Sequence, residues 1–452
     1  MPSLNTLPKA LVLLVLLHGA SNSFGQGGPA ESPYSAYGFG DMVPVTRGPL
    51  ALMGGAGIAI TEPFNAVSDN PASYTGMRRP SFDLSVAARS ASFSNSTSSV
   101  GRQEAGFMGF SIGVPFGQGK WGLSMGLAPL TDVSYTTTDR RPLEVGEVKY
   151  TYTGTGGLDV IHAGVGRRIH ASKSDSLGHL GNRLSIGANF NYIFGGVEQT
   201  RDALYPAGQN FTNLRAFSAL NLKAPTGELG MLWQGDLTHK LERDGNNWRY
   251  AIGATVKLPV RFTAGHREVL SSYTVSSAGI ETFRDSISEL SGARGTVEWP
   301  VGLGFGGSIS NAHWMLTAEA RLRDFSSATF EVPGYATFGS MSQGTTFIAG
   351  ARFVPADEGP LFKRSVYRAG LRYGNDYIRV KDTDLQQMAV SMGLSLPLNA
   401  LQTNSYLHIG GEFGQRGTTD NGLVKEQYAV LWIGLTLTPW KLERWFEPYR
   451  IQ

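Results

Sequence analysis

The chain has no cysteine, no long apolar run and little net charge. The absence of Cys in its 452 residues excludes disulfides, thiolate metal sites, a catalytic thiol and a lipidated N-terminal cysteine. The net charge of +3 is too small to indicate a nucleic-acid partner, and no Lys/Arg run of the kind that follows phosphates occurs. The sequence also lacks a phosphate loop, so we expect no bound nucleotide or other cofactor.

The apolar stretch near the N-terminus is too short for a membrane helix. Lys9 precedes an apolar core from Ala10 to Leu17, and small residues then lead to Gln26. An apolar core of about eight residues cannot cross roughly 30 Å of hydrocarbon as a helix, which disfavours a membrane anchor. The pattern therefore predicts a secretory signal peptide over residues 1–25.

Period-two alternation is the main feature of the remaining sequence. From Met388 to Pro397, apolar side chains fall on one face, and small or polar ones on the other. From Trp314 to Phe325 the second face carries charges. An arginine facing lipid at mid-bilayer would cost about 2–4 kcal/mol, so the charged face must be the lumen of a barrel. The charged residues that we assign to this luminal face are Glu319, Arg321, Arg323, Arg352, Arg368, Arg372 and Glu412.

The alternating segments predict an all-β fold, a transmembrane antiparallel β-barrel of about 14 strands over residues 81–438. The stretch from Leu214 to Lys223 leaves 16 strands open as an alternative. We expect both termini in the periplasm, a C-terminal periplasmic tail over residues 439–452, and long outer loops at 130–156, 201–227, 275–297 and 326–344. Aromatic residues near strand ends, including Trp299, Trp314 and Trp432, are candidates for interfacial girdles.

A glycine-rich segment precedes the first predicted strand. It contains Gly54, Gly55 and Gly57, and the turn Asn70-Pro71-Ala72 follows. Small residues allow a segment to pack compactly in a crowded lumen, and Asn-Pro favours a tight turn. An ordinary surface turn is the alternative interpretation.

This GGAG segment, the Asn-Pro-Ala turn and the predicted barrel together resemble the FadL family of outer-membrane transporters for hydrophobic compounds. The stretch from Ser32 to Asp41 also resembles uncharacterised FadL-like proteins of Bacteroidetes-type bacteria. The resemblance implies a hatch over residues 26–80 that plugs the lumen, shaped by the glycines and the turn named above. It further implies a lateral opening at a kink in the third strand, where Pro129 is the candidate and a plain strand end is the alternative.

The resemblance implies passive uptake of small hydrophobic or amphiphilic molecules across the outer membrane of a Gram-negative bacterium. Luminal arginines offer a carboxylate site, although solvated charges are ordinary in a wet lumen. Other expected partners are outer-membrane lipids and the barrel-assembly machinery. The alternative function is a scaffold or shuttle for a secreted protein, as in type IX secretion. We expect no enzyme and no metal site: the G-x-S-x-G matches at Ser111 and Ser124 lie in alternating strands, whereas a nucleophile elbow needs a strand-to-helix turn.

Overall fold

The computed structural model describes residues 32–43, 48–144, 146–172, 181–206, 211–238, 247–276, 278–337, 339–356, 358–398 and 404–439. The expected signal peptide, and all but the first residue of the expected tail, lie outside these ranges. Within them, no helix has both the length and the apolar character needed to span a membrane.

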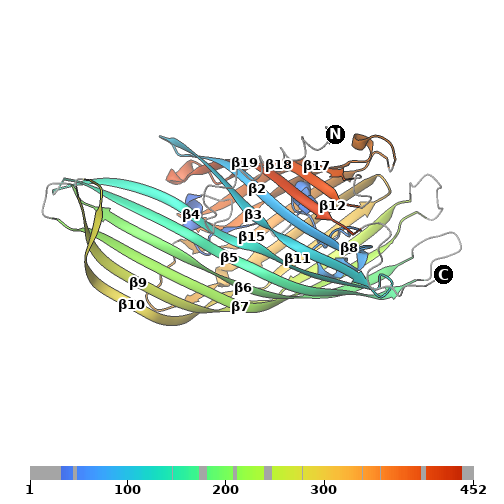
Figure 1. Cartoon of the computed structure of the whole chain (residues 1–452), viewed down its shortest axis with the longest axis horizontal. Helices are drawn as coiled ribbons and strands as arrows, with labels where there is room; N and C mark the ends of the chain where they lie inside the picture. Colours follow the sequence, from blue (N-terminus) through green and yellow to red (C-terminus); the bar gives the residue numbers. More distant parts are fainter. Residues whose placement is uncertain are drawn as a thin grey trace, which may run out of the picture.

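The described residues form a closed antiparallel barrel of 14 wall strands (Figure 1). The ladder between β19 and β2 closes the wall, running from Lys425 opposite Ser94 to Leu437 opposite Phe82. This ladder leaves no free edge between the first and the last wall strand, and a free edge in hydrocarbon would have costly unpaired backbone groups. The strands are β2 (Ser81–Ser94), β3 (Ser99–Phe116), β4 (Trp121–Leu143), β5 (Gly146–Ala171), β6 (Arg183–Leu204), β7 (Asn213–Asp236), β8 (Arg249–Lys257), β9 (Val260–Val275), β10 (Glu281–Trp299), β11 (Gly302–Ser310), β12 (Trp314–Asp324), β13 (Thr329–Glu331), β14 (Ser340–Met341), β15 (Gln343–Phe353), β16 (Val366–Val380), β17 (Thr383–Pro397), β18 (Tyr406–Arg416) and β19 (Lys425–Leu437).

Neighbouring wall strands are interrupted at the same height. β8 and β9 together pair along β7 and are separated at Leu258 and Pro259, while β10 and β11 are separated opposite them at Pro300 and Val301. Proline has no N–H for the ladder, which explains both breaks. Each pair therefore counts as one wall strand, and the predicted number of 14 is confirmed. The uncertain stretch from Leu214 to Lys223 lies within β7 and adds no strand.

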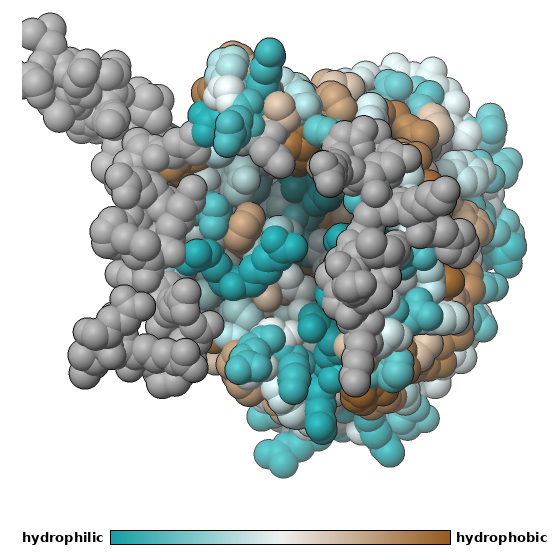
Figure 2. Space-filling model, turned by 90° about the vertical axis from the view of Figure 1, so that its right-hand side faces the viewer, coloured by the Kyte–Doolittle hydropathy of each residue, from teal (hydrophilic) through white to brown (hydrophobic). Residues whose placement is uncertain are grey.

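The alternation in the sequence matches the two faces of the wall. On β17, Met388, Val390 and Met392 are exposed, whereas Ala389 and Ser391 are buried. Figure 2 looks onto the end of the barrel where β2 begins and β19 ends, and its hollowed interior shows hydrophilic side chains. The predicted place of Trp299 and Trp432 in an interfacial girdle is wrong, because both side chains are buried and do not lie at the outer surface.

The wall is much taller on one side than on the other. β4 to β7 have 22 to 26 residues each, whereas β12, β15 and β18 have 11. A tilted strand needs only about 9–11 residues to cross a bilayer. Three of the predicted long loops are therefore wrong: most of 130–156, 201–227 and 275–297 is strand, and we call this region the extended wall (Figure 1). The stretch 326–344 is mostly irregular, as expected.

The residues before β2 lie inside the barrel in two parts. The first part, which we call the arm (Ser32–Val43), contains the short helix η1 (Pro33–Ala36) and the strand β1 (Asp41–Met42). The second, which we call the inner segment (Gly48–Met77), contains η2 (Gly48–Met53) and η3 (Pro71–Gly76). Most of their side chains are buried, and both parts contact strands around the wall.

Candidate functional site

The glycines at the start of the inner segment bring its backbone against charged wall residues. Gly54 and Gly55 have φ of +70° and +89°, a region that side chains rarely adopt. The N–H groups of Gly57 and Ile58 both donate to Glu319 Oε1, at 2.6 and 2.5 Å. These contacts join predicted residues from the inner segment and from β12 at one place in the lumen.

Wall glycines allow equally close approach from the other side. A Cβ atom on Gly370 of β16 would lie 2.1 Å from Gly54 N, and one on Gly187 of β6 would lie 2.3 Å from the carbonyl carbon of Pro71. Both distances are too short for real contacts. The wall therefore accommodates the inner segment only because these inward positions have no side chain.

Asn70 holds the predicted turn together. Its Oδ1 accepts from Ala72 N at 3.0 Å and caps η3, in which Pro71 is the first residue. Its Nδ2 donates to Ile58 O at 2.6 Å and to Met231 O on β7 at 3.0 Å. Asn70 is fully buried, so one side chain ties the turn, the glycine-rich stretch and the wall into a unit. The alternative of a surface turn is wrong.

The predicted luminal charges face inward and most are paired. Arg321 pairs with Asp69 at 3.1 Å and with Glu319 at 3.0 Å, and it donates to Gly55 O. Arg352 and Arg368 lie 3.3 and 3.4 Å from Glu62. Arg372 pairs with Glu412. Arg321, Arg352 and Arg368 are therefore not simply solvated lumen charges, because they hold the inner segment by charge-assisted hydrogen bonds, whereas the Arg372–Glu412 pair joins β16 to β18.

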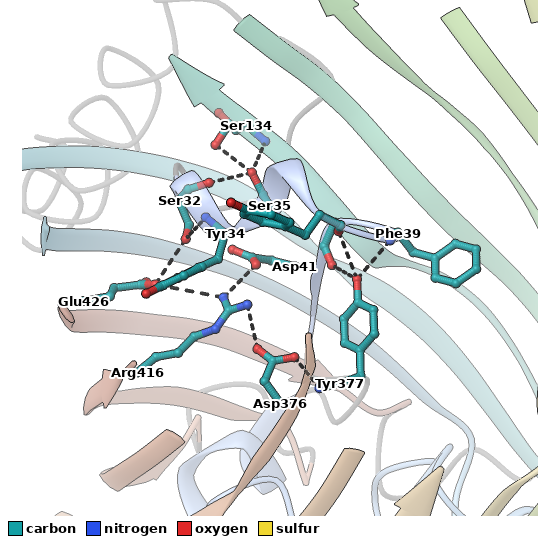
Figure 3. Close-up of polar contacts among 12 residues, drawn as sticks. Ser32, Tyr34, Ser35, Phe39, Asp41, Ser134, Asp376, Tyr377, Arg416 and Glu426 are labelled. Atoms are coloured by element: carbon teal, nitrogen blue, oxygen red, sulfur yellow. Dashed lines mark hydrogen bonds and ion pairs between the residues drawn. The ribbon is translucent and has the colours of Figure 1, made fainter. Parts of the chain in front are cut away.

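A second cluster, which we call the arm cluster, was not predicted (Figure 3). Arg416 of β18 lies 2.6 Å from Asp41 of the arm and 2.6 Å from Asp376 of β16. It also faces Glu426 of β19 at 3.9 Å, and Glu426 pairs with Arg89 of β2. No motif marks these residues, because Asp41 and Arg416 are far apart in the sequence and the alternation pattern assigns only a face.

Uncharged residues of the arm also hold it against the wall. Ser32 Oγ donates to Glu426 Oε2 at 3.2 Å, and Ser32 N donates to Ser134 O on β4 at 2.9 Å. Tyr34 lies under the Arg416 guanidinium, 5.2 Å from ring centroid to Cζ. The Tyr34 hydroxyl donates to Val424 O at 2.5 Å. The arm thus crosses the lumen from β4 to β19 (Figure 3).

The wall is incompletely paired where β4 passes Pro129. The ladder between β3 and β4 runs only from Phe116 opposite Trp121 to Phe110 opposite Leu127. The ladder between β4 and β5 is irregular between Pro129 and Thr131, but β4 continues to Leu143, so the alternative of a plain strand end is wrong. Residues 99–109 of β3 and 128–143 of β4 do not pair with each other, and we call this stretch of the wall the β3–β4 gap.

The arm covers the β3–β4 gap from inside. In β1, Asp41 and Met42 pair with Asp132 and Thr131 of β4, and Val43 N donates to Leu130 O at 3.1 Å. In the arm, β1 thus pairs with β4 at a position that β3 leaves unpaired, since β3 pairs with β4 only from Trp121 to Leu127.

Two cavities lie among these parts. The larger has a volume of about 340 Å³ and is bounded by the arm, the inner segment and the wall, within the range of small-molecule sites, roughly 300–1,000 Å³. Met108 of β3 and Leu130 of β4, which flank the β3–β4 gap, both line it. The smaller, of about 70 Å³, lies against β5, β6 and β10 and also touches Leu130.

Sequence comparison decides the family. The family model BamG matches residues 7–452, nearly the whole chain. The chain belongs to the BamG family. No curated protein sequence matches this BamG-family chain.

Solved structures show the same fold as this BamG-family protein. The toluene transporter TbuX of Ralstonia pickettii is 15% identical, with 87% of this chain and 99% of that chain covered and a TM-score of 0.53. A FadL homologue of Pseudomonas aeruginosa is 13% identical (88% and 99% covered, TM-score 0.52), and the toluene transporter TodX of Pseudomonas putida is 13% identical (91% and 99% covered, TM-score 0.51). The predicted FadL-like fold and outer-membrane β-barrel are confirmed; the suggested Bacteroidetes-type origin stays a prediction.

The structural neighbours are transporters rather than enzymes. Ser111 and Ser124, the serines of the two hydrolase-like matches, lie within β3 and β4. Ser124 Oγ is 3.3 Å from His162 Nε2 in the buried lumen. Neither serine is at a strand-to-helix turn, the geometry that exposes the nucleophile of α/β-hydrolases.

Proposed function

We propose that this protein is an outer-membrane channel for passive uptake of small hydrophobic or amphiphilic molecules. In this proposal, residues 26–80 form a hatch, both chain termini are periplasmic, and the extended wall faces the outside of the cell. Ligand enters from the outside, occupies the cavity beside the hatch and leaves sideways through the β3–β4 gap. The transport of toluene by TbuX and TodX, which have this fold, supports the proposed ligand class.

The observation that carries the proposal is the contact between the large cavity and the β3–β4 gap. Met108 and Leu130 line the cavity and flank the gap, and among the described residues it is the arm that pairs with β4 there from inside. Releasing Met42 and Val43 from β4 exposes a path from the lumen to the outer leaflet. The β3–β4 ladder ends at Leu127, two residues before Pro129, which has no N–H to extend a ladder.

A disulfide lock tests the exit. Met42 and Thr131 are opposite each other in an antiparallel pair, a separation that a disulfide can bridge, and the chain has no other cysteine. Met42→Cys/Thr131→Cys should block uptake of radiolabelled toluene by Gram-negative cells when oxidised, and a reductant should restore uptake. The matched control joins Thr138 to Thr151, which already pair within the wall, and should leave uptake unchanged.

Two results would count against the proposal. Cells that express the unmodified protein should take up toluene faster than cells that lack it, and equal rates would refute transport. If the oxidised Met42–Thr131 lock leaves uptake at the unlocked rate, ligand does not leave through the β3–β4 gap.

The second candidate function is a scaffold or shuttle that binds a protein partner. The N-terminal part of β10 supports this scaffold function. Ile280 precedes the strand, Phe283 and Ile287 lie within it, and all three side chains are more than half exposed. Exposed apolar groups often mark interaction sites. The prefix of the family name, shared with the barrel-assembly machinery, agrees with such a partner. Recovery of a stoichiometric protein partner from detergent extracts, without solute uptake, would favour this candidate.

A further inference from the structure

Two cations lie at one rim of the wall without an acidic partner. The turn at residues 117–120 joins β3 to β4 at the end of the barrel where β2 begins, and Arg167 of β5 is opposite Trp121, the first residue of β4. Lys120 and Arg167 are both exposed. Among the described residues, no carboxylate lies within 4 Å of either side chain. This part of the rim therefore has two positive charges that no described side chain balances.

An aromatic pair holds the Arg167 side chain. Its Cζ lies 4.7 Å from the Trp121 ring centroid, a distance typical of cation–π contacts. The Trp121 ring in turn stacks on that of Phe116, with centroids 5.8 Å apart and an interplanar angle of 17°. Arg168 N donates to Lys120 O at 2.9 Å, so the backbone ties the turn to β5. Because tryptophan is enriched at the level of lipid head groups, we place both cations at that level.

The outer face of β5 continues from Arg167 as a row of apolar residues, Val165, Ala163 and Ile161, which we call the β5 strip. On either side of Ala163 lie Met125 of β4 and Phe190 of β6, whose side chains are 54% and 59% exposed. Neighbouring strands are about 4.8 Å apart, so the methyl group of Ala163 leaves room between these two longer side chains. A single acyl chain can therefore lie along the β5 strip in the hydrocarbon.

We propose that Lys120 and Arg167 bind the phosphate of an anionic phospholipid of the phosphatidylglycerol type, and that one acyl chain lies on the β5 strip. The Arg167 guanidinium donates two parallel hydrogen bonds to the phosphate, a geometry that suits arginine, and Lys120 adds a second charge. A phospholipid fits better than free phosphate because Arg167 and the apolar strip follow each other on one strand. The inference does not rest on transport, since this site lies outside the lumen.

Native mass spectrometry of the full chain in detergent tests the site with phosphatidylglycerol and phosphatidylcholine of equal acyl chains. The unmodified protein should bind one phosphatidylglycerol about ten- to thirtyfold more tightly, the gain expected from two cations near a head group. Lys120→Gln/Arg167→Gln should abolish this preference, and Arg167→Lys should keep most of it. The matched control is Arg261→Gln/Arg267→Gln, which removes two exposed cations from the outer face of β9 and should keep the preference.

Folding of each variant is checked by heat-dependent mobility in gels. Lys120→Gln changes only a turn residue and covers the case in which the double variant does not fold; it should lower the preference about fivefold. Equal affinity of the unmodified protein for both lipids, or a folded double variant that keeps the preference, overturns the phosphate contact.

A second substitution tests the β5 strip. Ala163→Phe fills the strip and should weaken phosphatidylglycerol binding about tenfold, the effect of about two fewer buried methylene groups. Ala318→Phe, at an exposed position on the outer face of β12, is the control and should bind as the unmodified protein does. If Ala163→Phe binds phosphatidylglycerol as tightly as Ala318→Phe, the cations bind phosphate without the strip, and the phospholipid site is refuted.

Discussion

Replacing Arg416 by methionine should release the arm from the wall. Arg416 is 7% exposed and is the residue through which Asp41 and Asp376 are neutralised. Within the arm cluster, Arg89 and Arg416 face Asp41, Asp376 and Glu426, so the charges sum to −1. Without Arg416 the sum becomes −2, and two buried carboxylates lose their ion-pair partner.

Removing one partner of a buried ion pair costs about 3–5 kcal/mol. Because each 1.4 kcal/mol is a factor of ten, the equilibrium for release of the arm should rise about a hundredfold to several thousandfold. Hydrogen exchange measures this rise at the amides of Tyr37 and Gly40, which donate within the arm to Tyr34 O and Tyr37 O. Exchange in the wall strands should not change.

Two variants control this experiment. Arg379→Met removes an exposed pair with Asp384, which contributes about 0–1 kcal/mol, so arm exchange should rise less than about fivefold. Asp41→Asn removes the excess negative charge, and Asp41 Oδ2 has no hydrogen-bond partner in the described part of the chain, so its effect should be smaller than that of Arg416→Met. The argument from charge is refuted if Arg416→Met behaves like Arg379→Met, or if Asp41→Asn has the larger effect.

Three further predictions concern the inner segment. Deletion of Gly54–Ala72 should raise the permeability of liposomes to small hydrophilic solutes, and unchanged swelling rates would argue against a hatch. Gly370→Val should displace the backbone at Gly54 and speed hydrogen exchange there, whereas Gly265→Val, whose added Cβ meets nothing within 4 Å, should not. Asn70→Ala removes three hydrogen bonds, worth about 0.5–1.5 kcal/mol each, and should speed exchange in η3 about tenfold to a thousandfold; no change would mean that the turn holds without this side chain.

The membrane-spanning part of the fold was predictable because every second residue of a barrel strand faces lipid and is therefore apolar. Each substitution of a charge on the lipid side is costly, so the pattern of β12 and β17 identifies both the strand and its faces. The same constraint predicted that Glu319 and Arg321 point inward. This constraint acts only where one face meets lipid. The strands of the extended wall are longer than the about 9–11 residues that a tilted strand needs to cross a bilayer, so the constraint does not act along their whole length and the sequence predicts loops there.

Partner choice within the lumen was not predictable. Alternation places Arg321 and Arg372 on the inner face but does not say that one binds Asp69 and the other Glu412. The arm cluster required the tertiary structure, since its charges come from the arm and β2 at one end of the sequence and from β16, β18 and β19 at the other. The irregular β4–β5 ladder at Pro129 agrees with the expected disturbance, because proline has no N–H for a ladder, and the lateral opening there stays a prediction.

The contacts of the arm determine where it can open at least cost. Across the β3–β4 gap, the C-terminal end of the arm is held by the two-residue strand β1 and by the bond from Val43 N to Leu130 O, whereas Ser32 N at its N-terminal end donates to Ser134 O. Two or three backbone hydrogen bonds contribute about 1–4 kcal/mol together, which leaves the open state populated at about 0.1–10%. Separating Arg416 from the carboxylates of the arm cluster costs at least as much as breaking these backbone hydrogen bonds. The proposed passive channel has no energy source, so opening should release Met42 and Val43 while Asp41 stays on Arg416, and the arm acts as a flap anchored at its N-terminal end.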